Sequence, residues 1–513
     1  MGIGSGLESV AGRVLGSSLG PVSRRLLRRH HHQTLHRGDI DETRRSSARD
    51  QWWGEAPQWY PGGTPPRAHN HLTPLIDGDQ YLSALHEAIT GAHDYVYIAG
   101  WCLTPNTPLE RKPGTSLVST QLLPVLIEAA KRLPVRILLW AGAPALIQPT
   151  ARAVDTVHRE IEAAAAQAGV DLRCVLDKSA HLSHCHHQKT VVIDGQTAFV
   201  GGMDLTTFQG DRWDEFAHPL RGGPNWHDVQ LRIEGETVVD VEHNFRERWS
   251  AVTGETDLPH QEPVVDAAWH TPVQIVRTIP PRTYEFAPQG EFGIHHAYVE
   301  LIRGAQRLIY LENQYLWSPD VVEALIDAMN APHAESFRIV IVLPAQAYSG
   351  KWDNDKHVMA LRKADGERGL VEVYSIYASG PHAGVDPFRY RPIYVHAKVT
   401  IVDDEWLSVG SANLNTRGLV TDSELNALVH ESDLARDVRA HLWAEHLAIA
   451  PEEIARTDPI SLIDGAWKQQ ASENARIMSQ GNRPLISNVH RYETGHAPGS
   501  WLLDEAEALT FEH

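Results

Sequence analysis

The sequence predicts an α/β protein made of two duplicated halves, each a sheet flanked by helices. Two observations lead to this fold class. Segments with the apolar period of helices alternate with short β-branched, apolar segments. The same order of segments occurs again about 200 residues later, a spacing that indicates a domain duplication and is too long for a solenoid repeat. We therefore expect two similar halves related by a pseudo-twofold axis.

The first half is expected over residues 71–262. Its helices are expected at 80–90, 122–133 and 152–168 and in a stretch that ends near residue 249. Its strands are expected at 94–101, 135–142, 171–176, 187–194, 197–202 and 228–235. A basic tail and an aromatic-rich lead-in, residues 1–70, precede this half. We expect the lead-in aromatics Trp52, Trp53, Trp59 and Tyr60 to pack this loop onto the folded domain.

The second half is expected over residues 263–450 and repeats the order of the first. Its helices are expected at 295–306, 321–331 and 355–368 and in a stretch that ends near residue 447. Its strands are expected at 307–316, 337–344, 370–378, 393–403, 406–413 and 424–431. Residues 451–513 are expected to form an irregular, acidic C-terminal extension.

Composition limits the classes of protein to consider. The chain has 513 residues, of which 42% are hydrophobic and 22% charged, as in ordinary globular proteins. Three cysteines cannot form a disulfide framework, so a reducing, cytoplasmic location is expected. No apolar run has the length of a transmembrane helix, and the N-terminus lacks the apolar core of a secretory signal.

The charge is negative and unevenly distributed. The formal net charge is −19, which argues against nucleic acid as a partner because polyanion binding depends on Lys and Arg. Residues 1–37, however, hold six Arg and one Glu. We expect this tail to be disordered and without a partner. The alternative is peripheral contact with anionic lipid at a membrane surface. A monomer is expected.

The most specific feature is a motif that occurs twice. HQKTVVID, residues 187–194, recurs as HAKVTIVD, residues 396–403, and both copies read His-x-Lys, four residues, Asp. On a strand, residues i and i+2 point to the same face, so each copy presents an imidazole beside an ammonium. The catalytic motif residues are His187, Lys189, Asp194, His396, Lys398 and Asp403. The two aspartates have the opposite parity and fall at a turn, so we expect them to brace it.

Two such motifs brought together at the interface of the halves suit the cleavage of a phosphodiester. One neutral histidine attacks phosphorus and forms a covalent phosphohistidine, while the other, protonated, gives its proton to the leaving oxygen. The second histidine then removes a proton from water or an alcohol. The lysines offset charge on the phosphoryl oxygens, so neither a metal nor another cofactor is required.

Further residues are expected around the motifs. A carboxylate behind each imidazole would fix its tautomer. Glu424 follows His396 by 28 residues and Asp214 follows His187 by 27, which makes them the candidates. Small residues after each motif let backbone amides approach a phosphate, with Gly202 and Ser411 as candidates. Asn413 can donate an amide hydrogen bond, whereas its counterpart, Asp204, cannot.

These residues together resemble the phospholipase D superfamily. HHQKTVVIDGQTAFVGGMDL, RWDEFAHPL and WHDVQLRIEG look like the first half of the eukaryotic type, the plant enzymes especially, and YLENQYLWSP and TDSELN look like its second half. The likeness spans about residues 75–447. It implies two α/β/α sandwiches that meet at the active site, and a phospholipid such as phosphatidylcholine as the substrate, hydrolysed or transphosphatidylated. No region matches the plant type's calcium-binding C2 domain, so calcium dependence is not expected.

The resemblance also implies roles for the motif residues. His187 would be the nucleophile and His396 the acid and base. Lys189, Lys398 and Asn413 would hold the phosphate. The resemblance implies these individual roles, whereas the residue types alone indicate only the kind of chemistry.

Several alternatives stay open at the level of sequence. The same chemistry would serve a cardiolipin synthase-like phosphatidyltransferase, a nuclease or another phosphodiesterase of the superfamily. A different class is a catalytically inactive scaffold that binds membranes. The histidine-rich segment HLSHCHHQK, residues 181–189, could also be interpreted as a zinc site. Its histidines and cysteine, however, are too closely spaced to form one set of ligands around an ion.

Overall fold

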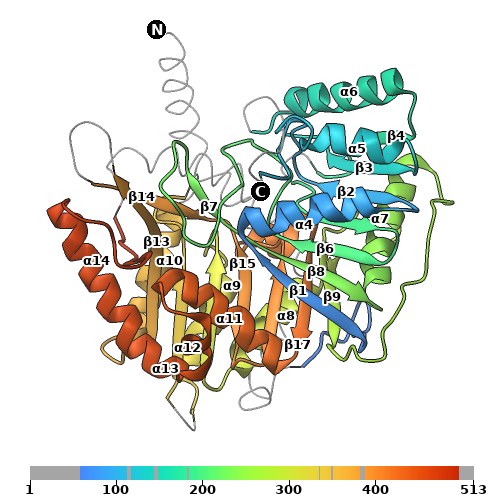
Figure 1. Cartoon of the computed structure of the whole chain (residues 1–513). Helices are drawn as coiled ribbons and strands as arrows, with labels where there is room; N and C mark the ends of the chain where they lie inside the picture. Colours follow the sequence, from blue (N-terminus) through green and yellow to red (C-terminus); the bar gives the residue numbers. More distant parts are fainter. Residues whose placement is uncertain are drawn as a thin grey trace, which may run out of the picture.

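The computed structural model describes residues 58–111, 117–143, 148–181, 184–333, 336–347, 351–381 and 388–495. Two mixed sheets face one another, and each carries helices on its outer side (Figure 1). The predicted α/β class with two sheets flanked by helices is therefore confirmed. The tail and the aromatics Trp52 and Trp53 lie outside the described residues.

The first half contains a seven-stranded sheet. In spatial order its strands are β1 (Asn70–Ile76), β8 (Val229–Gly235), β6 (Thr197–Gly201), β5 (Thr190–Ile193), β2 (Val96–Gly100), β3 (Val135–Trp140) and β4 (Leu172–Asp177). The pairs β2–β3 and β3–β4 are parallel, and the others are antiparallel. The parallel part arises from the β–α–β segments at the start of this half.

The second half repeats this sheet strand for strand. Its matching order is β9 (Val273–Ile279), β17 (Glu424–His430), β16 (Trp406–Gly410), β15 (Lys398–Val402), β11 (Leu308–Asn313), β12 (Arg338–Val342) and β13 (Val371–Pro381). Four strands extend it: β10 (Glu291–Phe292), β14 (Phe388–Val395), β7 (Asn225–His227) and β18 (Val489–Arg491). Seven strands in the same order in both halves support a duplication.

The helices divide between outer and shared layers. The outer helices are α4 (Asp77–Gly91), α5 (Leu122–Ala130) and α6 (Ala151–Ala168) on the first sheet and α8 (Gly293–Gly304), α9 (Pro319–Asn330) and α10 (Lys351–Asp365) on the second. Helices α7 (Val238–Thr253) and α11 (Ser432–Leu447) contribute to one core that both sheets share. No helix in the described part of the chain is long and apolar enough to cross a membrane.

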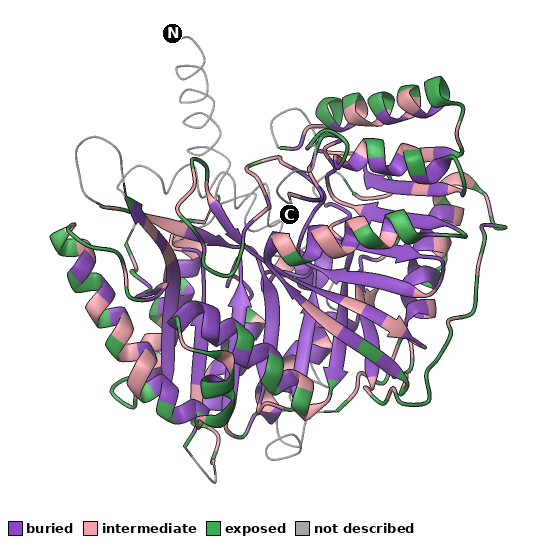
Figure 2. Cartoon of the chain, viewed as in Figure 1, coloured by how far each residue is buried: buried purple, intermediate pink, exposed green. Residues whose placement is uncertain are grey.

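Strand β2 shows how the sequence serves two cores. Val96 and Ile98 face the outer helices, whereas Tyr97 and Ala99 face the core between the sheets. A strand buried on both faces needs a nearly continuous apolar sequence, and most residues of the interior strands are buried in Figure 2.

Two segments link the halves in addition to the chain segment that runs from the end of α7 to β9. Trp59 of the lead-in packs edge-on against Trp406, with ring centroids 4.8 Å apart, and Tyr60 stacks on His296. The lead-in thus packs as expected where it is described. Strand β7, from the first half, adds to the edge of the second sheet by pairing in parallel with β14.

The C-terminal extension differs from the expectation. Residues 451–491 are ordered elements rather than an irregular segment: α12 (Pro451–Arg456), α13 (Pro459–Leu462), a π-helical turn (Ile463–Trp467), α14 (Lys468–Gln480) and β18. The cause is Trp467, a fully buried residue whose ring contacts Trp443, Tyr310 and Tyr374 of the second half. Strand β18 completes the attachment by pairing with β13.

Candidate active site

The two motifs lie where strands β5 and β15 begin. Strand β5 starts at Thr190, so His187 and Lys189 precede it, and β15 starts at Lys398, so His396 precedes it by two residues. The strands are therefore shorter at this end than predicted. The backbone instead pairs with the opposite half: His187 N donates to Ser423 O at 2.8 Å, and His396 N donates to His227 O at 2.8 Å.

This crossing gives each histidine a carboxylate from the other half. Glu424, at the start of β17, lies with Oε1 2.9 Å from Nδ1 of His187. Asp228, between β7 and β8, lies with Oδ2 2.6 Å from Nδ1 of His396. Both carboxylates are buried, at 1% and 0% exposure, so they can fix the orientation and tautomer of the rings. The Nε2 atom of each ring is left for chemistry.

The carboxylate partners predicted from chain separation were wrong. Glu424 serves His187 and not His396. Asp214 accepts hydrogen bonds from the backbone of Trp226 and the side chain of Asn225, and no hydrogen bond joins it to His187 in the described part of the chain. The physical reason is that each motif pairs with a strand of the opposite half. Sequence reasoning missed Asp228. The signal that could have found it is positional: Asp228 directly follows His227 in the first half, as Glu424 directly follows Ser423 in the second.

The two lysines have unequal surroundings. Lys189 lies with Nζ 3.1 Å from Oδ2 of Asp204. Each lysine donates to the carbonyl of its own motif histidine, and Lys398 also donates to Oε1 of Gln314 at 3.3 Å. Asn413 replaces Asp204 in the second half, and its buried Oδ1 has no hydrogen-bond partner among the described residues. The second half-site therefore has a neutral amide where the first has a carboxylate.

The predicted phosphate-binding roles of Gly202 and Ser411 do not fit the structure. The amide of Gly202 donates to Val229 O at 3.2 Å, and that of Ser411 donates to Leu425 O at 3.1 Å. A Cβ at residue 202 would lie 2.2 Å from Oδ1 of Asp228, and the Ser411 hydroxyl donates to Glu424. Gly202 leaves space for Asp228, and Ser411 donates a hydrogen bond to Glu424. The backbone N–H of each residue is already hydrogen-bonded to a neighbouring strand.

The motif aspartates hold backbone segments, as their parity predicts. Asp194 accepts three backbone N–H groups, from His93, Asp94 and Tyr95, each at 2.8 Å. Asp403 accepts the equivalent three from Gln306, Arg307 and Leu308. Each carboxylate thus ties the turn after the motif to the start of a neighbouring strand, and neither touches a reacting histidine in the described structure.

Replacing Asp194 by alanine is expected to lower the free energy of unfolding by about 2 kcal/mol, because one buried and two partly buried N–H groups lose their acceptor. Asp194→Asn is expected to cost less, since an amide oxygen remains and asparagine tolerates the observed φ of 55°. Urea unfolding measures both effects. Activity per folded molecule is expected to stay close to that of the wild type; a large loss of kcat at full folding would instead assign Asp194 to the chemistry.

Burial and charge set the protonation of the site. Burial, with the positive charges of Lys189 and Lys398, lowers the pKa of His187 well below its usual range. Burial, with Lys398 and Arg212, does the same to the pKa of His396. Burial lowers the pKa of Lys398 to about 7, although Asp228 opposes this. Without an anion in the site, both imidazoles are therefore neutral near pH 7.

Aromatic rings border both histidines. Trp101 meets His187 edge to face at 6.1 Å between centroids, and its ring also lies 5.9 Å from Nζ of Lys189. Trp226 meets His396 in the same way at 5.1 Å. These rings limit how the imidazoles can turn and exclude water from one side of each.

Among its described residues, the segment considered for zinc does not assemble a metal site. Cys185 accepts from Arg417, His186 lies 3.0 Å from Asp177, and His187 binds Glu424, so these side chains face different partners. A second set of residues lies closer together. Ligand-type atoms of Asp77, His218, His227 and Glu445 lie within 4.8 Å of one another, and so do those of His227, Glu312 and His446.

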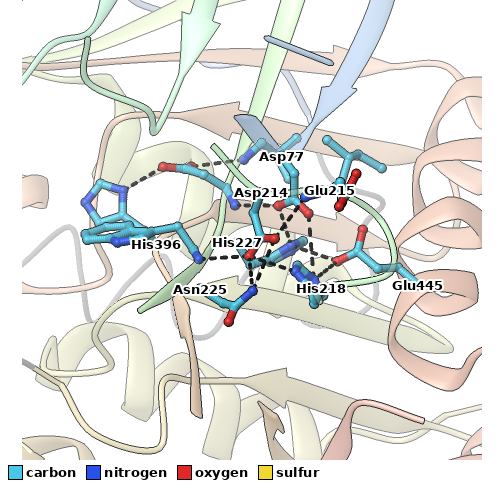
Figure 3. A network of polar contacts seen from close by, with 12 residues as sticks. Asp77, Asp214, Glu215, His218, Asn225, His227, His396 and Glu445 are labelled. Atoms are coloured by element: carbon cyan, nitrogen blue, oxygen red, sulfur yellow. Dashed lines mark hydrogen bonds and ion pairs between the residues drawn. The ribbon is translucent and has the colours of Figure 1, made fainter. Parts of the chain in front are cut away.

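The second set is best described as a network of ion pairs (Figure 3). Its closest nitrogen–oxygen distances, 2.7 to 3.0 Å, are those of direct hydrogen bonds. Two ligands held by one tetrahedral ion at about 2.0 Å would stand farther apart. Burial alone would lower the pKa of His218, but Asp77 and Glu445 outweigh it and raise the pKa to about 10.

This shift predicts a stability difference that depends on pH. Because the folded-state pKa of His218 lies above the free value of 6.5, its stabilising contribution is complete below pH 6.5 and is lost as pH rises toward 10. The difference in free energy of unfolding between wild type and His218→Gln should shrink from pH 7 to pH 9.5, by up to about 1.4 kcal/mol per pH unit. Denaturant titrations at several pH values measure it. A difference that stays constant would show that His218 is not the titrating group.

Comparisons with known proteins agree with this architecture. Residues 88–224 match the family described as "Phospholipase D", and residues 298–445 match "Cardiolipin synthase, PLD-like domain". Phospholipase D A of Dictyostelium discoideum is 27% identical over 76% of this chain, and phospholipase D alpha 1 of Ricinus communis is 26% identical over 74%. The chain belongs to the phospholipase D superfamily. It spans 36% and 66% of the lengths of these two relatives.

A solved structure supports the fold. The phosphatidylserine synthase of Haemophilus influenzae superposes with a TM-score of 0.51, covers 85% of this chain and 98% of its own, and is 13% identical. At this identity the likeness concerns the fold alone.

Proposed function

We propose that the protein is a phospholipase D-type phosphodiesterase that cleaves glycerophospholipids such as phosphatidylcholine to phosphatidic acid. The observation that carries the proposal is the crossed arrangement of the site. Two histidines, each held at Nδ1 by a buried carboxylate of the other half, stand beside two buried lysines. Relatives named phospholipase D match over most of the chain and support the lipid substrate.

Binding of the diester is the first step of the proposed mechanism. The phosphodiester anion lies between Lys189 and Lys398, with Asn413 donating an amide hydrogen bond to a phosphoryl oxygen. Burial and nearby positive charges, Lys398 and Lys189 among them, hold the pKa of His396 low, and the negative charge of the diester offsets these lysines. Binding therefore raises the pKa of His396, so that this histidine enters the reaction with a proton on Nε2.

The first chemical step forms a phosphohistidine. Nε2 of His187 attacks phosphorus, and the bond between phosphorus and the headgroup oxygen breaks. That oxygen takes the proton from Nε2 of His396 and leaves as the alcohol. Glu424 holds the Nδ1 proton of His187 and stabilises the positive charge that develops on its ring.

The second step releases the lipid. His396, now neutral, removes a proton from water, and the resulting hydroxide attacks phosphorus as the bond to His187 breaks. An alcohol in place of water gives the transphosphatidylated lipid. The lysines provide the cationic role that metals fill in other phosphoryl transfers, so the reaction is proposed to proceed without a metal.

The proposal is tested by incubating the protein with a panel of phospholipids, with ethanol and with EDTA. We expect phosphatidylethanol and phosphatidic acid from at least one lipid, with no loss of rate on chelation. Cleavage of a nucleotide or DNA diester with lipids untouched would contradict the substrate. Cardiolipin formed from phosphatidylglycerol in preference to hydrolysis would favour the phosphatidyltransferase, which the description of the family matched by residues 298–445 supports. A protein that binds vesicles and cleaves nothing would be a scaffold.

A further inference from the structure

A buried network of charged side chains lies behind the acid–base half of the site (Figure 3). It joins the start of α4, the loop before β7, strand β7 itself, β11 and α11. Its members are at most 1% exposed: Asp77, His218, His227, Glu312, Glu445 and His446. The first three belong to the first half of the chain and the others to the second, so the network also crosses between the halves.

His227 is the central residue of the network. Its Nδ1 lies 3.0 Å from Oδ1 of Asp77 and 2.9 Å from Oε1 of Glu445, and its Nε2 lies 2.7 Å from Oε2 of Glu312. An ionised carboxylate only accepts hydrogen bonds, so both ring nitrogens must donate, which requires the imidazolium form. Burial alone would lower the pKa of His227, but the three carboxylates raise it well above the usual range.

His227 is also bonded directly to the reacting pair. Its carbonyl accepts the backbone N–H groups of His396, at 2.8 Å, and Ala397, at 3.1 Å. The next residue is Asp228, which holds Nδ1 of His396. Asp77, bonded to the His227 ring, also accepts from Asp228 N at 3.2 Å and donates its own N–H to Asp228 O. The ring, the carboxylate and the catalytic imidazole thus form one continuous set of hydrogen bonds.

The nucleophile half lacks this arrangement. Ser423 occupies the position equivalent to His227, one residue before Glu424, and its carbonyl accepts from His187 N. The nearby ring is that of His186, with one nitrogen 3.0 Å from Asp177 and the other 3.0 Å from the Ser423 hydroxyl. Arg248 balances the charge of Asp177, at 2.9 Å. The two half-sites therefore differ in what holds their carboxylates.

We infer that His227 is a positioning residue for proton transfer. Its ring, hydrogen-bonded at both nitrogens, fixes the position of Asp228. Asp228 in turn holds the imidazole of His396 toward the leaving oxygen. This inference rests on the proposed function and specifies which buried group supports the acid step. Electrostatics act in the same direction. Burial raises the pKa of Asp228 to about 7, while Lys398 and His227 favour its ionised form. An ionised Asp228 stabilises the protonated form of His396 that the first step needs.

Leaving groups of different basicity test the inference. A choline alkoxide needs a proton to leave, whereas p-nitrophenolate leaves without one. In single-turnover experiments, His227→Gln is expected to release choline from phosphatidylcholine about 100-fold more slowly than the wild type. Its release of p-nitrophenol from phosphatidyl-p-nitrophenol is expected to stay within about threefold, because the attack by His187 does not require the acid.

Matched variants separate positioning from general damage. Glu312→Gln removes the carboxylate at Nε2 of His227 and is expected to show the same selectivity in weaker form, which covers the case in which His227→Gln does not fold. His218→Gln alters the same network but touches neither Asp228 nor His396 by a hydrogen bond in the described structure. It is expected to change both rates by the same factor.

The outcomes are distinguishable. Equal losses on both substrates for His227→Gln and Glu312→Gln, with an active wild type, would overturn the inference alone. A wild type that cleaves neither substrate would overturn the proposed function and the inference with it. The charge has its own readout: the nitrogen chemical shifts of His227 should report two N–H groups at pH 8. A neutral tautomer, or one metal ion bound per chain and lost in His227→Gln, would overturn the inference as well.

Discussion

Replacing His187 by alanine is expected to lower kcat on phosphatidylcholine by about 10⁴-fold or more, because the atom that forms the covalent intermediate is lost. The loss should be of similar size for phosphatidyl-p-nitrophenol, since both substrates need the nucleophile. Steady-state rates and single-turnover rates measure it. Although only 13% of its side chain is exposed, His187 contacts Glu424 and the edge of the Trp101 ring, so the truncation should leave the fold largely intact.

The control for this prediction is the unfolding transition of the variant, which should stay close to that of the wild type. His186→Gln is the matched variant for His187→Ala, because it replaces the preceding histidine. It removes the imidazole that contacts Asp177 but leaves the nucleophile in place. A His187→Ala protein that folds and keeps full turnover would contradict the mechanism.

Glu424→Gln and Asp228→Asn are each expected to lower kcat by about 10²- to 10⁴-fold, the range for carboxylates that orient a catalytic histidine. The two variants should differ in substrate dependence. Asp228→Asn weakens the acid, so its effect should be larger for choline than for p-nitrophenol. Glu424→Gln weakens the nucleophile, so it should affect both leaving groups. Single-turnover release of the two alcohols measures the difference.

Asp214→Asn is the control for the carboxylates. Asp214 is buried and binds Trp226 N and Asn225, but it has no hydrogen bond to either reacting histidine among the described residues. Its replacement should lower stability more than the chemical rates. If Asp214→Asn slowed single-turnover release as much as Glu424→Gln while remaining folded, the crossed pairing would be wrong.

The crossed pairing also shows where sequence reasoning succeeds and fails here. Apolar periodicity and the repeated motif were sufficient to predict two α/β halves, since these signals are local and occur twice. The carboxylate partners depend on which strands meet between the halves. His187 pairs in the backbone with Ser423, and His396 with His227. No spacing within one half encodes those contacts, so carboxylates sought 27 and 28 residues downstream in the same half, Asp214 and Glu424, are paired with the wrong histidines, and Asp228 is missed.

Small residues were misinterpreted for a related reason. Gly202 and Ser411 have the composition of a phosphate loop, and turn chemistry alone could not reveal that sheet pairing uses their amides. Space for Asp228 explains the glycine, and a hydrogen bond to Glu424 explains the serine. In the C-terminal extension, local sequence does not predict the ordered elements, because the contacts of Trp467 that hold them are with rings far away in the sequence.

The most direct test of the central claim is to trap the covalent intermediate. A His396→Ala protein lacks the base of the second step, so it should accumulate the phosphatidyl group after reaction with phosphatidyl-p-nitrophenol, whose leaving group needs no acid. Mass spectrometry of the digested protein is expected to place the adduct on His187. An adduct on His396 in a His187→Ala protein, with none on His187 in the His396→Ala protein, would contradict the assignment.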